Sequence, residues 1–285
     1  MLASSRLLIM DNMKKKLPIV FVWFLVFMEG MNQINGQQQQ DPLRMNGGSI
    51  LAMSGENCVA MAVDKRLGSG PQMVHTIPRT VFIPNERVLV GFTGLEGDVQ
   101  TFRSQLAIAA EDKAGRFGFF SNDDVHDVEN EQYKCDISPT GTSTLISHLL
   151  YGRRRTRPFY VEPIIVGLES VSESNLDTEE NEHDRAVSEA KIARKFKPFL
   201  CSQDIIGAKS TSDAFVCAGA ASKSLYGTAE ALWRPGLTPE QLVQVCGKAF
   251  LSALERDCLS GYGAVLYLVI GGVGVMEYDL ICRND

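Results

Sequence analysis

The order of the predicted elements indicates an α+β fold in which two antiparallel sheets pack face to face with helices outside. Short strands with alternating small and apolar residues come first, two helical segments follow, and strands then return. Two more helical segments and a hairpin complete the chain. A doubly wound parallel sheet is excluded, because it needs strands and helices to alternate one by one.

Two predicted strand pairs open the folded part of the chain. In the first, small and apolar residues alternate in strands 46–53 and 58–66 on either side of a Ser-Gly-Glu-Asn turn. In the second, strands 81–83 and 88–92 flank a turn that begins with Pro84. Because successive side chains of a strand point to opposite faces, this alternation predicts strands that belong to sheets.

The remaining elements are predicted from apolar spacing and from turn residues. Helices are expected over about a dozen residues after Asp98, over 140–151, over 222–233 and after Thr238. The last begins with Thr238-Pro239-Glu240-Gln241, which offers an N-cap, a proline at the first helical position and a capping-box glutamine. Further strands are expected at 159–167, 196–201, 215–218, 264–270 and 273–280, the last two joined by a two-glycine turn.

Composition places the chain among ordinary globular proteins. Its 285 residues are 45% hydrophobic and 22% charged, enough to bury a sizeable core. The net charge of −6 argues against a nucleic-acid partner. Acidic residues gather near 111–139 and 169–193, and we interpret these two segments as insertions into a domain that spans 45–285.

Residues 1–44 are predicted to be an N-terminal extension. Lys14-Lys15-Lys16 precedes an apolar run at 17–28, as in a secretory signal peptide. A run of 12 residues is shorter than the roughly 20 that a spanning helix needs, and a clear cleavage site is missing before the glutamines at 37–40. A disordered extension, or a start at a later methionine such as Met45, is the alternative that we favour, so no membrane partner is expected.

The cysteines give no sign of a disulfide framework or of a zinc site. They show no paired spacing, and the four histidines lie far from any cysteine pair. We therefore expect a reducing compartment, no metal and no cofactor. The seven cysteines are Cys58, Cys135, Cys201, Cys217, Cys246, Cys258 and Cys282.

Several segments together resemble proteasome beta subunits. They are the opening hairpin with Val59–Arg66, the Gly91-Phe92-Thr93-Gly94-Leu95 turn, Leu225-Tyr226-Gly227 and the loop Arg256–Gly263. The resemblance covers nearly everything from residue 45 to 285 except the two acidic insertions. It implies the N-terminal-nucleophile (Ntn) hydrolase fold, a four-layer αββα sandwich with two antiparallel sheets between two helix layers.

The resemblance also implies where a catalytic site would lie. Active members of the family carry a threonine at the head of the first strand, and its own amine serves as the base. Counting back from Asp64 puts Gly48 in that place, and glycine has no side chain to attack a carbonyl. The family's lysine falls near Thr80, beside Arg79, whose guanidinium is a poor substitute for a lysine that can shift its pKa. A supporting serine falls on Ala220.

Other positions of the family pattern are retained. We interpret the whole set as a vestigial site, since loss of the nucleophile, the lysine and the serine removes most of a unit whose members act together. An active hydrolase with Ser49 as the processed nucleophile is the alternative. For Asp64 we expect a structural role, closing the strand end through an ion pair with Arg66 and backbone hydrogen bonds. The vestigial positions are Gly48, Asp64, Thr80, Ala220, Asp257, Ser260 and Gly261.

The expected function is that of a non-catalytic structural subunit in protein degradation. The resemblance implies assembly with other proteasome alpha and beta subunits in a 28-subunit barrel, located in the cytoplasm and nucleus. We hypothesise that residues 68–75 shape the substrate pocket of a neighbouring subunit. The arginine cluster at 153–157 is interpreted either as a contact surface or as a solvated helix end, where cations complement the helix dipole.

Overall fold

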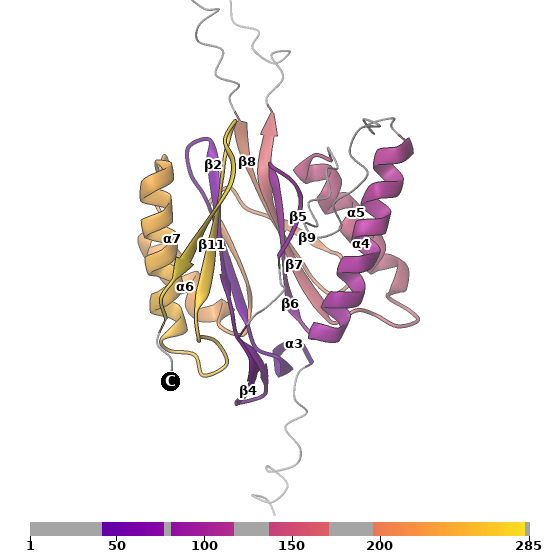
Figure 1. Ribbon diagram of the computed structural model, residues 1–285, viewed down its shortest axis with the longest axis horizontal. Helices are drawn as coiled ribbons and strands as arrows, with labels where there is room; N and C mark the ends of the chain where they lie inside the picture. Colours follow the sequence, from indigo (N-terminus) through magenta and orange to yellow (C-terminus); the bar gives the residue numbers. More distant parts are fainter. Residues whose placement is uncertain (1–41, 77–80, 117–136, 171–195, 283–285) are drawn as a thin grey trace, which may run out of the picture. The chain divides into compact units, whose positions relative to one another are not determined.

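The computed structural model describes residues 42–76, 81–116, 137–170 and 196–282 (Figure 1). Its strands form two five-stranded antiparallel sheets and a separate two-stranded ribbon. The first sheet has the order β10-β1-β2-β11-β12 and the second the order β5-β6-β7-β8-β9. The predicted α+β class with two antiparallel sheets is therefore confirmed.

The strands and helices follow one another as the sequence pattern predicts, with three added strands and one added short helix. The first sheet consists of β10 (Phe215–Gly219), β1 (Ser49–Ser54), β2 (Cys58–Asp64), β11 (Ala264–Ile270) and β12 (Gly274–Leu280). The second consists of β5 (Val81–Asn85), β6 (Val88–Gly94), β7 (Val161–Ser170), β8 (Phe196–Gln203) and β9 (Lys209–Thr211). The helices are α3 (Pro42–Met45), α4 (Glu96–Arg116), α5 (Pro139–Arg153), α6 (Ser222–Leu232) and α7 (Pro239–Leu254).

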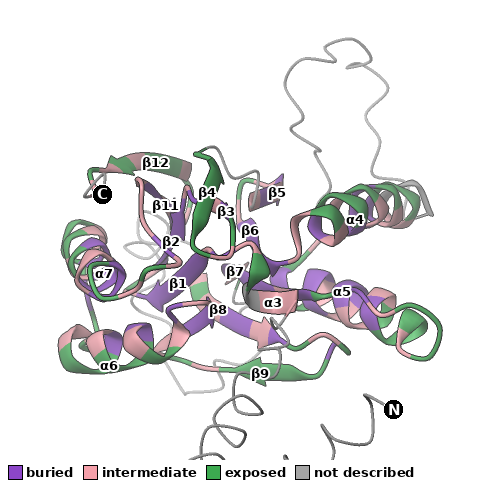
Figure 2. Cartoon of the chain, turned by 90° about the horizontal axis from the view of Figure 1, so that it is seen from below, coloured by how far each residue is buried: buried purple, intermediate pink, exposed green. Residues whose placement is uncertain are grey.

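Three buried apolar clusters hold these elements together. One lies between the first sheet and helices α6 and α7, and a second between the second sheet and helices α4 and α5. The third joins the facing sides of the two sheets. Figure 1 shows the same order of helices, sheet, sheet and helices across the molecule, and Figure 2 shows that the helices bury one side and expose the other.

The two central strands of the first sheet are buried along their whole length. In β1, Leu51 and Met53 pack toward the helices, whereas Ile50 and Ala52 pack toward the second sheet. Strand β2 alternates in the same way. Every residue of β1 and β2 therefore has a buried environment, which explains why small and apolar residues fill both sets of alternating positions.

The helix starts follow local capping chemistry. The Thr238 hydroxyl accepts a hydrogen bond from the Gln241 N–H, and the Gln241 side chain accepts one from the Thr238 N–H, so the predicted capping box forms. Helix α5 begins in a related way, because the Ser138 hydroxyl accepts from the Gly141 N–H ahead of the first turn.

The structure departs from the sequence-based expectations in three places. Helix α4 has 21 residues and continues to Arg116, well past the dozen predicted, so its last turns enter the segment interpreted as an acidic insertion. The short strand β9 was not predicted. Neither was the ribbon of β3 (Leu67–Ser69) and β4 (Gln72–His75), which spans the segment 68–75 that we assigned to a neighbour's substrate pocket.

Most of the remaining insertion residues lie outside the described parts of the chain, as do residues 1–41, so the predicted domain boundaries stay predictions. None of the helices in the described ranges is long and apolar enough to cross a membrane.

Candidate functional site

Six of the seven predicted site residues lie around one end of the first sheet. Gly48 lies directly before β1, Asp64 ends β2, and Ala220 follows the end of β10. The loop between α7 and β11 contributes the others, Asp257, Ser260 and Gly261. Thr80, the seventh predicted position, lies outside the described residues, and so does its neighbour Arg79.

Gly48 is held by main-chain hydrogen bonds on both sides. Its N–H donates to the Leu259 carbonyl at 3.2 Å, and its carbonyl accepts from the Ala220 N–H at 2.9 Å. Its φ of +84° is one that residues with a side chain rarely adopt. A side chain is not excluded by crowding, because the nearest atom to an added Cβ would be the Arg66 carbonyl oxygen at 3.8 Å. The position at which the resemblance predicts a nucleophile thus contributes main chain alone.

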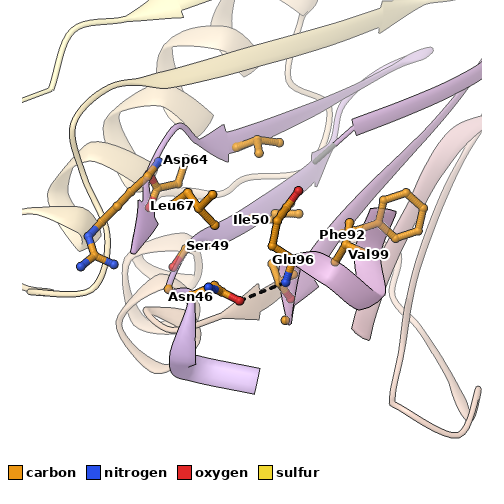
Figure 3. A pocket seen from close by; sticks show the side chains of 14 residues that line it. Asn46, Ser49, Ile50, Asp64, Leu67, Phe92, Glu96 and Val99 are labelled. Atoms are coloured by element: carbon orange, nitrogen blue, oxygen red, sulfur yellow. Dashed lines mark hydrogen bonds between the residues drawn. The ribbon is translucent and has the colours of Figure 1, made fainter. Parts of the chain in front are cut away.

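The segment before Gly48 is tied into the fold. The Asn46 carbonyl accepts from the Gly68 N–H at 2.8 Å, and the Met45 carbonyl accepts from the Gly70 N–H at 2.8 Å. The Asn46 side chain donates to the Gly68 carbonyl at 2.9 Å and accepts from the Glu96 N–H at 3.0 Å (Figure 3). Asn46 therefore joins the ribbon to the start of helix α4, and sequence reasoning gave it no such role.

A chain of side-chain hydrogen bonds connects β1 to the loop that follows α7. The Ser49 hydroxyl accepts from the Ala221 N–H at 2.9 Å and lies 2.8 Å from the Ser260 hydroxyl. Ser260 donates its proton to the Asp257 carboxylate at 2.7 Å, so Ser49 is the donor to Ser260. Because Ser49 is only 1% exposed, its hydroxyl is fully committed to this network.

Asp64 lies at the centre of the site with both carboxylate oxygens engaged. One accepts from the Arg66 N–H at 2.7 Å and the other from the Gly261 N–H at 3.1 Å. Burial raises the pKa of Asp64 from 3.8 to about 7, although these two N–H groups and the Arg66 charge act in the opposite direction. The carboxyl group therefore joins two separate loops. The backbone hydrogen bonds predicted for Asp64 are confirmed.

The predicted ion pair between Asp64 and Arg66 does not form. Within the described ranges, only Lys65 and Asp279 form an ion pair. The Arg66 guanidinium instead donates to the Leu259 carbonyl at 3.0 Å and to the Gly70 carbonyl at 2.8 Å. The reason is geometric: the main-chain N–H of Arg66 already binds the carboxylate, and its side chain extends away toward the ribbon.

Two glycines make room for this arginine. A Cβ at Gly47 or at Gly68 would lie 2.4 Å from the Arg66 side chain. The guanidinium is thus enclosed between the segment before β1 and the ribbon, and Arg66 is only 3% exposed. The glycine before Gly48 is explained by this packing as well as by its φ of +70°.

A small cavity lies beside Gly48. Its volume is about 20 Å³, and its polar lining includes Asn46, Ser49, Asp64 and Glu96 (Figure 3). This volume holds about one water molecule and no peptide side chain.

Comparisons with known proteins all identify the same protein family. The sequence model of the family described as "Proteasome subunit" matches residues 45–119 and 186–269. The chain is 34% identical over 240 residues to "Proteasome subunit beta type-3" of Picea mariana, covering 84% of this chain and 97% of that protein. The protein of the same name from Saccharomyces cerevisiae is 33% identical over 245 residues, covering 86% and 99%. That of Drosophila melanogaster is 32% identical over 227 residues, covering 80% and 91%.

Proposed function

Since the chain belongs to the proteasome subunit family and is similar to its beta type-3 members, we propose that it is a non-catalytic structural beta subunit of a 20S core particle. Membership of this family implies assembly with other proteasome subunits. The chain's own task is to complete a ring and present side surfaces to its neighbours, while other beta subunits carry out cleavage in ubiquitin-dependent protein degradation.

The observation that carries the proposal is the anchored segment before Gly48. An N-terminal nucleophile needs a free amine at the head of β1. Here Met45 and Asn46 form main-chain hydrogen bonds with the ribbon, and the Asn46 side chain binds the start of α4. These contacts support a chain that keeps its upstream residues, and Gly48 offers no hydroxyl even if they are removed.

The alternative, an amidohydrolase that uses Ser49 after processing, is not favoured. The Ser49 hydroxyl is buried, accepts from Ala221 and donates to Ser260. To act as a nucleophile it would have to leave both partners.

The proposal also includes the number of copies of the subunit in the particle and its cellular location. The subunit occupies one position in each of the two beta rings of a 28-subunit barrel of alpha and beta subunits. It works in the cytoplasm and nucleus. Free thiols at each cysteine within the described ranges support a reducing compartment, in which structural disulfides are rare.

Two measurements on the natively purified complex test the proposal. Mass spectrometry of the intact subunit gives its first residue, which we expect to lie upstream of Gly48. A chain that begins at Ser49 would instead support the hydrolase. Identification of the co-purifying proteins should yield other proteasome alpha and beta subunits, and their absence would refute the structural role.

A further inference from the structure

Four arginines close the C-terminal end of helix α5. They are Arg153, Arg154, Arg155 and Arg157, and with the exposed side chains of Tyr151 and Tyr160 they form what we call the arginine turn. Two main-chain bonds shape it: the Arg154 N–H donates to the Tyr151 carbonyl at 3.3 Å, and the Thr156 N–H donates to the Arg153 carbonyl at 3.2 Å. Three of the four arginines are exposed, and Arg154 is half-buried.

Aromatic rings hold two of these side chains in place. The Arg154 guanidinium carbon lies 3.6 Å from the centre of the Tyr151 ring, and Nη1 donates to the Tyr151 carbonyl at 2.9 Å. The Arg153 guanidinium carbon lies 4.9 Å from the centre of the Phe159 ring. Stacking of this kind fixes a long side chain in advance, so less conformational entropy is lost when a partner binds.

The positive charge of the arginine turn is not balanced within the described chain. None of the four arginines lies within ion-pair distance of a described carboxylate, since Lys65 and Asp279 form the one such pair there. Asp98, which is near the turn, accepts from the Tyr160 N–H instead. The helix dipole favours cations at this end, but its influence fades within the last turn and does not account for four charges over five residues.

We propose that the arginine turn docks onto an acidic surface of a neighbouring protein subunit. Arginine and tyrosine are the residues enriched at protein interfaces, and the guanidinium fork binds carboxylates in a bidentate manner. A protein partner is favoured over nucleic acid because the chain has a net charge of −6 and belongs to a family of assembling subunits. This inference rests on the proposed function and adds to it a docking surface and the chemistry of its partner.

The first test reverses the charges of Arg155 and Arg157, the two arginines of the turn for which no stacking on an aromatic ring is described. Full-length Arg155→Glu/Arg157→Glu is tagged and co-expressed with the untagged wild-type chain, and the ratio of the two is measured in the purified core particle. We expect the variant to be under-represented by about tenfold, since like charges placed across an interface oppose docking. The matched control is Arg234→Glu, just after the end of α6, an exposed arginine whose guanidinium donates only to main-chain carbonyls.

A second test identifies the partner chemistry without disturbing the charge. In Arg155→Lys particles, a carbodiimide joins the new amine directly to a carboxylate that it contacts. We expect cross-linked peptides between residue 155 and an aspartate or glutamate of another subunit. This measurement remains informative if the double variant fails to fold.

The outcomes separate the inference from the function on which it rests. Equal incorporation of the double variant and wild type, or the absence of a cross-link to another subunit, overturns the docking surface and leaves the structural role intact. The docking surface is also overturned if nucleic acid co-purifies with wild-type particles and is lost from double-variant particles while the variant is incorporated normally. If the tagged wild-type chain itself never enters a core particle, the proposed function fails, and the inference with it.

Discussion

Replacing Arg66 with lysine keeps the positive charge but removes the guanidinium group that hydrogen-bonds to two segments of the site at once. The guanidinium donates to the carbonyls of Leu259 and Gly70, which lie in two segments far apart in the sequence. A lysine ammonium is a single point and can reach one of these carbonyls at a time, so one of the two hydrogen bonds is lost.

The expected cost follows from these two bonds. A hydrogen bond from a charged donor contributes about 1.5–3 kcal/mol. Both carbonyls are half-buried, and the Leu259 carbonyl also accepts from the Gly48 N–H, so losing one guanidinium bond leaves no buried carbonyl without a partner. The shorter lysine also packs less well between Gly47 and Gly68. Because lysine retains one of the two bonds, we expect Arg66→Lys to lower the free energy of unfolding by about 1.5–3 kcal/mol.

Urea unfolding of the full-length chain measures this loss, and amide hydrogen exchange locates it. Exchange should accelerate first in residues 45–48, in the ribbon of β3 and β4, and in the loop 257–261. Arg234→Lys is the matched control, because Arg234 also donates to two main-chain carbonyls but is exposed. We expect the control to change the unfolding free energy by less than about 0.5 kcal/mol. Equal effects of the two substitutions, or unchanged exchange in the three segments, would refute the reasoning.

Two further predictions concern the hydrogen-bonded network. Burial raises the pKa of Asp64 from 3.8 to about 7, so the folded chain binds its proton more tightly than the unfolded chain does. This contribution to stability is fully present below about pH 4 and is lost as the pH rises through about 7, and Asp64→Asn should flatten that slope in urea unfolding at a series of pH values. Ser49→Ala should lower the free energy of unfolding by about 1–3 kcal/mol, because it leaves the buried Ala221 N–H without an acceptor, and thermal or urea unfolding measures the loss.

Each of these substitutions has a matched comparison. For the carboxyl group it is Asp279→Asn, which removes an exposed carboxylate. An identical slope in wild type and Asp64→Asn would show that the site does not retain the proton. For the hydroxyl group it is Ser104→Ala, whose exposed side chain donates to a helix carbonyl. A Ser49→Ala loss no larger than that of Ser104→Ala would mean that the network does not stabilise the fold.

Much of the secondary structure was predictable because it depends on short-range rules. Alternating small and apolar residues identified β1 and β2, since both faces of these strands are buried. The Thr238–Gln241 pattern located the start of α7, because a capping box involves only neighbouring residues. The end of α4 was missed because its packed apolar positions end at Ala110, whereas the helix continues to Arg116.

The ribbon of β3 and β4 was missed for a related reason. Its residues alternate poorly, and β4 is exposed along its length. What positions it is a set of hydrogen bonds to Met45, Asn46 and Arg66, and none of these leaves a local pattern in the sequence.

From its residues, the chain is predicted to form strand pairs and helices in the order of this fold, and the resemblance predicts a glycine at the nucleophile position. The tertiary structure shows what the site became. In the folded chain the Arg66 side chain points away from Asp64, and the segment before Gly48 is hydrogen-bonded to the ribbon. Ser49 is hydrogen-bonded to Ser260, 211 positions further along the chain. Such contacts depend on how distant segments meet in space, whereas residue spacing reports only the geometry of one helix or strand at a time.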